Sequence, residues 1–250
     1  MIKEAIRLGC PEIGFSVHSP IPEKTYCITP DRIGEYMHTV RELGERYSSS
    51  IRVYLGIELD LISELDTSGF DYVIGSVHGV IPDGRFHDVD HTADITRAII
   101  NELYGGDPYA YVEAYYAELR SLYSKTHCDI IGHFDLITKF IECDPVFSTS
   151  HPRYTEARDS AFSELIRTPA IFEVNTGAIS RGYRSSPYPE DAVLMKIKEA
   201  GKRVVINSDA HAVSGLGCMM EESARHLDAL GIGYYTSLSE LLADSRGAVN

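Results

Sequence analysis

The 250-residue sequence has no apolar run of membrane-spanning length and no basic-then-apolar leader at its start. A spanning helix needs about 20 apolar residues, so neither membrane insertion nor secretion is expected. Basic residues are also scarce: 23 Lys and Arg stand against 37 Asp and Glu, which leaves a formal net charge of -14. So acidic a chain is not expected to have nucleic acid or an anionic membrane as its main partner.

Paired cysteines are missing as well. The sequence has 5 cysteines, scattered and without CxxC spacing: Cys10, Cys27, Cys128, Cys143 and Cys218. This pattern disfavours both a disulfide framework and a zinc knuckle, and it favours reduced thiols. We therefore predict a cytoplasmic protein.

What is present is an alternation of strands and helices. No linker, low-complexity tract or charge block divides residues 1–250, so we predict a single domain. Short apolar runs predict buried parallel strands, and the length suits one α/β barrel. The predicted strands are 12–16, 53–59, 72–77, 129–132, 170–175 and 203–208, with 231–236 as a possible last one. Helices are predicted at 2–8, 30–47, 108–123, 189–201 and after Ser237, where Ser237 and Glu240 resemble a capping box.

Metal-binding residue types recur where these strands end. The residues at or just after the strand ends are His18, Glu58, His78, His133, Asn175, Asp209 and His211. Each alone has a simpler interpretation as a hydrogen-bonded structural side chain. Because parallel strands place their carboxyl ends at one face, however, the whole set is expected to converge in space.

Imidazoles and carboxylates are ligands for zinc, iron or manganese, and a carboxylate such as Glu58 can bridge two cations. The mixture predicts a multinuclear site for divalent metals. Asp209 and His211 are two residues apart after an apolar run, so an extended backbone places them on the same side. Two adjacent cations activate water and bind the attacking and leaving oxygens in a displacement at phosphorus. The pattern favours phosphate-ester hydrolysis, with Asp209 and His211 in catalytic roles.

An anionic substrate in so acidic a chain needs a local positive charge. Arg181 and Arg184 lie on a loop rich in Gly, Ser and Pro after the fifth predicted strand. A planar guanidinium suits bidentate phosphate recognition, so we predict that both bind the phosphate, the alternative being ordinary solvated side chains. His87 and His91 are predicted to be structural or solvent-exposed.

The sequence resembles the polymerase and histidinol phosphatase (PHP) superfamily, and within it the histidinol-phosphatase branch. The stretches that carry the resemblance are FSVHSP (15–20), GIELD (56–60), GSVHGV (75–80), GHFDLITKF (132–140), EVNTGAISRGYRSSPYP (173–189) and NSDAH (207–211). The resemblance implies a distorted β/α barrel of seven strands with up to three divalent metals. It also implies that His18, Glu58, His78, His133, Asp209 and His211 are metal ligands, and that Arg181 and Arg184 hold the phosphate.

Two departures from the family pattern stand out. The family begins with a strand that ends in an HxH motif, whereas this sequence starts at Met1 within the first predicted helix. We therefore expect the first strand to be lacking, one metal site to be impaired, and an upstream-extended chain to recover metal and activity. Val17 stands where the family usually has an aspartate before the histidine, and valine cannot orient a ligand.

The resulting hypothesis is a metal-dependent phosphatase that converts L-histidinol phosphate into L-histidinol and phosphate in histidine biosynthesis. The partner would then be a small phosphorylated metabolite. Two alternatives remain open: a catalytically silent PHP domain with an incomplete metal site, and a phosphatase for another phosphomonoester such as phosphotyrosine. The pattern fixes neither the metal nor the oligomeric state.

Overall fold

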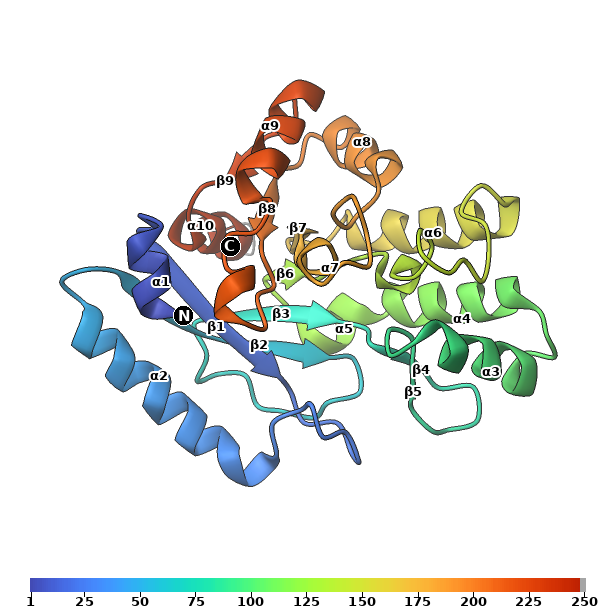
Figure 1. Ribbon diagram of the computed structural model, residues 1–250, viewed down its shortest axis with the longest axis horizontal. Coiled ribbons are helices and arrows are strands. Elements are labelled where there is room, and N and C mark those ends of the chain that lie inside the picture. Colours follow the sequence, from blue (N-terminus) through green and yellow to red (C-terminus); the bar gives the residue numbers. More distant parts are fainter. Residues whose placement is uncertain (248–250) are drawn as a thin grey trace.

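A computed structural model describes residues 1–247 and shows one curled, open sheet of parallel strands, a half-barrel (Figure 1). The strand order is β1-β2-β3-β6-β7-β8-β9, so neighbours in the sheet follow the chain order. The strands are β1 (Glu12–His18), β2 (Arg52–Asp60), β3 (Tyr72–Ser76), β6 (Ile130–Ile131), β7 (Ile171–Asn175), β8 (Val204–Asn207) and β9 (Tyr234–Tyr235). A separate antiparallel pair, β4 (Gly79–Val80) and β5 (His87–Asp88), lies beyond the end of β3.

Helices connect the strands and cover the outer face of the sheet (Figure 1). The α-helices are α1 (Ile2–Arg7), α2 (Ile33–Tyr47), α3 (Ala93–Leu103), α4 (Pro108–Arg120), α5 (Leu122–Thr126), α6 (Pro152–Leu165), α7 (Gly177–Ser180), α8 (Asp191–Glu199), α9 (Met220–Leu230) and α10 (Leu238–Gly247). Short 3₁₀ turns occur at η1 (Pro30–Arg32), η2 (Leu136–Thr138) and η3 (Val213–Gly215). None of the helices within residues 1–247 is long and apolar enough to cross a membrane.

The two faces of the sheet carry different side chains because residues alternate along a strand. Outward-facing residues such as Leu55, Val73 and Phe172 pack with the helices in the main core. Inward-facing residues are apolar at the amino end of the strands and polar or charged at the carboxyl end. In β7, for example, Ile171 lies at the amino end and Glu173 follows on the same face. The carboxyl end of the inner face is therefore polar and buried.

The amino end of the inner face is closed by α10. Leu241 of this helix is fully buried in a second apolar cluster with inward-facing residues of five strands: Tyr54, Tyr72, Ile74, Ile130, Ile171 and Tyr235. Ser237 Oγ accepts a hydrogen bond from the Glu240 backbone N–H at 3.2 Å, which is one half of the predicted capping box. Apolar side chains fill the amino end of the half-barrel, so a functional site is expected at its carboxyl end.

The predicted parallel alternation is confirmed, and one helix start is corrected. The sequence pattern places a helix start at Pro189, but α8 begins at Asp191. Tyr188 instead pairs with Asn175 at the end of β7 through two backbone hydrogen bonds of 2.8 and 2.9 Å. Its ring is also fully buried, with 1% exposed. The tertiary contact therefore delays the helix by two residues.

Candidate functional site

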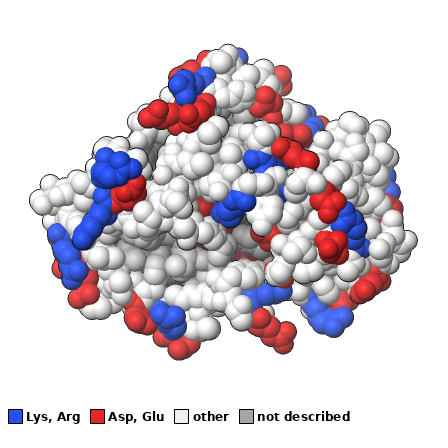
Figure 2. Space-filling model, viewed as in Figure 1, with Lys and Arg blue, Asp and Glu red and all other residues white. Residues whose placement is uncertain are grey.

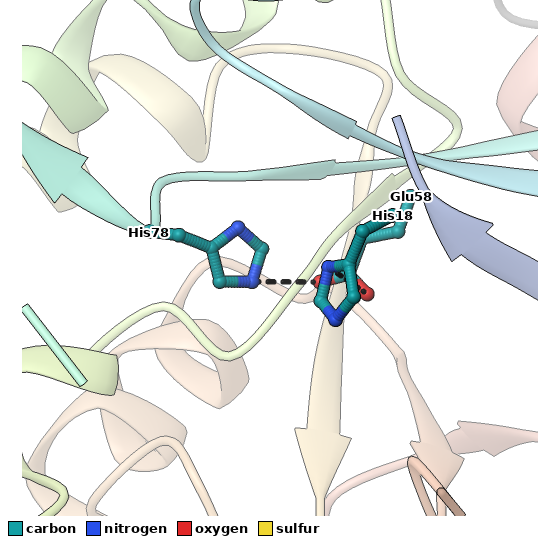
Figure 3. Close-up of side chains that lie close together, drawn as sticks. All are labelled: His18, Glu58 and His78. Carbon is teal, nitrogen blue, oxygen red and sulfur yellow. Dashed lines mark ion pairs between the residues drawn. The ribbon is translucent and has the colours of Figure 1, made fainter. Parts of the chain in front are cut away.

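Three predicted site residues meet around a single carboxylate, that of Glu58 at the end of β2. Figure 3 shows two of them, His18 and His78, beside Glu58. His18 Nδ1 lies 3.4 Å from Glu58 Oε2, and His78 Nε2 lies 3.2 Å from Oε1. His133, which follows β6, places its Nε2 3.0 Å from the same Oε1. The parallel register explains the convergence, because His18 and Glu58 are direct partners across β1 and β2.

Glu58 lies in a buried and strongly polarised environment. Burial alone would raise the pKa of its carboxyl, but the surrounding histidines hold that pKa well below its usual range. Ser76 Oγ donates a further hydrogen bond to Oε1 at 2.8 Å. Burial lowers the pKa of the His18 imidazole. The carboxylate is therefore kept ionised at the centre of the imidazoles.

A second carboxylate, Asp60, orients His78. Its Oδ2 accepts from the His78 backbone N–H at 3.0 Å and lies 3.1 Å from His78 Nδ1. Since a carboxylate only accepts, Nδ1 carries a proton and Nε2 faces Glu58. Burial lowers the pKa of His78, but the hydrogen bonds to Asp60 and Glu58 outweigh it and raise that pKa well above its ordinary value. The sequence analysis overlooked Asp60, although it follows Glu58 by two residues on the same strand face.

Glu173 is a second residue that the sequence analysis overlooked. It is 2% exposed, and burial raises the pKa of its carboxyl. The sequence feature that could have revealed Glu173 is a charged residue within an apolar run, two positions before Asn175. A charge is seldom placed inside a buried strand unless it has several hydrogen-bond donors.

Asp209 and His211 follow the end of β8, and His211 lies beside His18. The His18 and His211 ring centroids are 5.8 Å apart. Arg181 bridges the two residues: Nη2 donates to Asp209 Oδ2 at 3.1 Å, and Nη1 lies 3.1 Å from His211 Nδ1. All six predicted ligands and Arg181 therefore surround one region, and His211 is the most exposed of the six ligands.

Arg184 is placed differently from Arg181. Its side chain is only 5% exposed, and its guanidinium lies 4.7 Å from the centre of the Tyr188 ring. It donates to the hydroxyls of Thr138 and Ser186, and the nearest Glu142 oxygen is 3.9 Å from its Nε. Nε itself is buried without a hydrogen-bond partner among the described residues. A buried guanidinium so incompletely paired is suited to a bound anion.

The donor set fits a divalent cation. His18, Glu58 and His78 each offer one atom, and these atoms lie within 4.8 Å of one another. Imidazole nitrogens with one carboxylate are a usual ligand set for zinc. His133 Nδ1 is also buried without a hydrogen-bond partner in the part of the chain described. The molecular surface is hollowed near the centre of the view in Figure 2, with basic side chains at the edge of the hollow.

The remaining histidines lie outside this group. His87 Nε2 lies 2.9 Å from Asp83 Oδ1, and His91 is exposed. Val17 packs with the main core, so its side chain lies on the opposite face of β1 from His18.

Comparisons with known proteins agree on one family. A model of the PHP domain matches residues 1–177. Probable histidinol-phosphatase of Schizosaccharomyces pombe is 27% identical over 255 residues, covering 93% of this chain and 80% of the relative. Histidinol-phosphatase of Bacillus subtilis is 26% identical, covering 88% of both chains.

Two solved structures share the fold. The putative histidinol phosphatase of Listeria monocytogenes superposes with a TM-score of 0.74 at 18% identity, covering 89% of this chain and 92% of that one. The histidinol phosphate phosphatase of Lactococcus lactis, complexed with zinc, L-histidinol and phosphate, superposes with a TM-score of 0.62 at 16% identity. The coverage is 93% of this chain and 87% of that one.

Proposed function

The chain belongs to the PHP domain family, and from this we propose that it is a metal-dependent phosphatase that hydrolyses L-histidinol phosphate. The products are L-histidinol and phosphate, and the reaction belongs to histidine biosynthesis. The observation that carries the proposal is the meeting of His18, His78 and His133 around Glu58. Arg181 binds the neighbouring Asp209, and Arg184 lies on the Tyr188 ring, which is beside His133. The curated relatives named histidinol-phosphatase support the substrate.

His18, Glu58, His78 and His133 would hold the cation, and Asp209 and His211 would complete the ligand set. When bound, a divalent cation supplies a Lewis acid that activates water and polarises the phosphoryl group. Zinc, iron and manganese all suit these ligands. Up to three cations are expected from the family resemblance.

The chain's own residues bind and orient the phosphate. Arg184, buried and fixed between Thr138 and Ser186, would donate its planar fork to two phosphoryl oxygens. Arg181 would bind the same phosphate from the Asp209 side. Both guanidinium groups stabilise negative charge that grows on the oxygens during displacement. Asp209, already a hydrogen-bond acceptor for Arg181, would accept the proton that the attacking water loses and return it to the leaving alcohol oxygen.

A cytoplasmic location accompanies this proposal. All five cysteines within residues 1–247 are free thiols, which suits a reducing compartment.

The test is phosphate release by the purified chain loaded with zinc, manganese or iron. Histidinol phosphate should be hydrolysed with a higher kcat/KM than phosphotyrosine or p-nitrophenyl phosphate. His78→Ala should abolish the activity, while the surface variant Arg153→Ala should keep it. If the chain hydrolyses phosphotyrosine with the higher kcat/KM, the proposed substrate is wrong and the phosphotyrosine alternative is supported. Metal binding without turnover of any ester would instead support the silent-domain alternative.

A further inference from the structure

One buried carboxylate, that of Glu173, connects the ends of three neighbouring strands. Its Oε2 accepts hydrogen bonds from the His133 backbone N–H and from Asn175 Nδ2, both at 2.9 Å. Its Oε1 accepts from Asn207 Nδ2 at 2.6 Å. These three donors belong to the segment after β6, the end of β7 and the end of β8.

The two asparagines extend the connection to the backbone beyond each strand. Asn175 Oδ1 accepts from the Gly177 N–H at 2.8 Å, and Asn207 Oδ1 accepts from the Asp209 N–H at 3.2 Å. The two asparagines are also direct partners in the register of β7 and β8. Since a carboxylate only accepts and a backbone N–H only donates, each amide has one satisfactory orientation between them.

The segments held in this way carry the phosphate-binding end of the site. Gly177 is the first residue of α7, and Arg181 follows directly after that helix. A Cβ atom on Gly177 would lie 2.5 Å from Asp209 Oδ2 and 2.9 Å from Arg181 Nη2. Such close approach means that even a small shift between the β7 and β8 ends would change how Arg181 meets Asp209.

We infer that Glu173 is a positioning residue, which with Asn175 and Asn207 forms a hydrogen-bonded clamp. The Glu173 clamp sets the position of the proposed metal ligand His133 relative to Arg181 and Asp209. It acts through backbone N–H groups and does not touch the substrate. The inference rests on the proposed function for the roles of His133, Arg181 and Asp209 and for the choice of substrate in the kinetic assay.

Exchange of the carboxylate and an amide within the clamp provides a sharp test. Glu173→Gln introduces an NH₂ that must face another donor, and Asn207→Asp places two carboxylates against each other. In the double variant Glu173→Gln/Asn207→Asp, the glutamine amide donates to the new aspartate. All five hydrogen bonds of the clamp can then form again. Asp129→Asn is the matched control, because Asp129 is a buried carboxylate that also accepts from a backbone N–H, that of Val73.

Three measurements are made on each metal-loaded variant: kcat and KM with histidinol phosphate, zinc affinity by chelator competition, and the ¹⁵N–¹H signals of Gly177 and Asp209. We expect each single variant to lower kcat/KM by about tenfold or more, as loss of a supporting hydrogen bond does at comparable sites. Both amide signals should move. The double variant should recover most of the loss, and the Asp129 control should change neither kinetics nor these signals.

The outcomes separate this inference from the proposed function. If the single variants leave the Gly177 and Asp209 signals unchanged, or if the double variant performs no better than the single ones, the clamp is refuted. If the wild-type chain does not hydrolyse histidinol phosphate, the proposed function fails. The zinc affinities and the Gly177 and Asp209 amide signals would then still show whether Glu173 positions these segments.

Discussion

At the scale of single residues, the charged groups of the site differ in how much the fold needs them. The Arg181 side chain is 29% exposed, and within residues 1–247 its guanidinium has hydrogen-bond contacts with Asp209 and His211 alone. Arg184 is nearly buried against Tyr188. The sequence places both on a loop, where truncation of a solvated side chain would leave the core intact. The structure supports that description for Arg181 alone.

Arg181→Ala should therefore weaken catalysis far more than folding. A charge-assisted hydrogen bond contributes about 1.5 to 3 kcal/mol, so kcat/KM should fall by roughly ten- to a hundredfold. Inhibition by inorganic phosphate should weaken in parallel, while the melting temperature should change little. Arg153→Ala removes an arginine that pairs with Asp107 and Glu113 and serves as the control. An Arg181 variant with unchanged turnover would remove this residue from the phosphate site.

Asp60→Asn tests the orientation of His78. An asparagine oxygen in the place of Oδ2 carries no negative charge to hold the His78 Nδ1 proton, and its NH₂ group then faces the Ile62 backbone N–H, which donates to Asp60 Oδ1. Disturbing such a supporting carboxylate commonly costs about 10- to 100-fold in metal affinity, which zinc competition with a chelator would measure. Asp71→Asn is the control, because Asp71 accepts from the Leu55 N–H at 2.8 Å without touching a histidine. Equal zinc affinity in the wild type and the Asp60 variant would contradict the assigned role.

At the scale of elements, the inner face of β1, β2 and β3 depends on two glycines. Tyr72 lies across Gly14 and Gly56, and a Cβ on Gly56 would be 2.3 Å from Tyr72 Cζ. Glycine is needed here for space rather than for backbone freedom. The tyrosine in turn fills the apolar cluster beneath the site.

Gly56→Ala should consequently destabilise the protein, because overpacking a filled core typically costs about 1 to 3 kcal/mol. Gly34→Ala is the matched substitution in α2, where a Cβ would meet nothing within 4 Å. There the loss of backbone freedom in the unfolded chain should stabilise the protein by up to about 1 kcal/mol. Urea titrations of both variants would measure the two effects. Changes of the same sign would refute this steric account.

At the scale of the whole molecule, the site joins segments that are far apart in the chain. His18 and His211 lie close together although most of the sequence separates them. The open half-barrel brings β1 and β8 round to the same end (Figure 1). A cation held by side chains of several strands therefore binds the folded chain far better than the unfolded one.

Metal binding should for this reason stabilise the whole fold. A ligand at about 100 times its Kd contributes about 2.7 kcal/mol of stability when it does not bind the unfolded chain. Zinc should raise the melting temperature, and a chelator should lower it again. In Glu58→Gln the zinc-dependent shift should be much smaller, since the central carboxylate is lost. A zinc-dependent shift of the same size in both proteins would mean that the cation binds elsewhere.

Much of the fold follows from the sequence alone. The apolar runs of β2 and β7, which reach Glu58 and Asn175, identify buried parallel strands, because burial on both faces requires continuous apolar sequence. The run that leads to His18 was also predicted to be a buried strand, but β1 lies at the edge of the sheet and is only partly buried. The parallel topology then predicts that the strand-end residues gather at one face. These inferences rest on local patterns and on one topological rule, so they need no knowledge of side-chain packing.

The tertiary structure alone decided which polar groups meet. Asp60, Glu173 and Asn207 derive their roles from donors on neighbouring segments, and no sequence spacing encodes those contacts. Tyr188 ends as a buried partner of β7 rather than as the start of a helix, because its backbone pairs across the sheet. The sequence by itself determined which residue types reach the carboxyl face. Their mutual orientation was decided by hydrogen bonds between distant segments, which exist only once the sheet has curled.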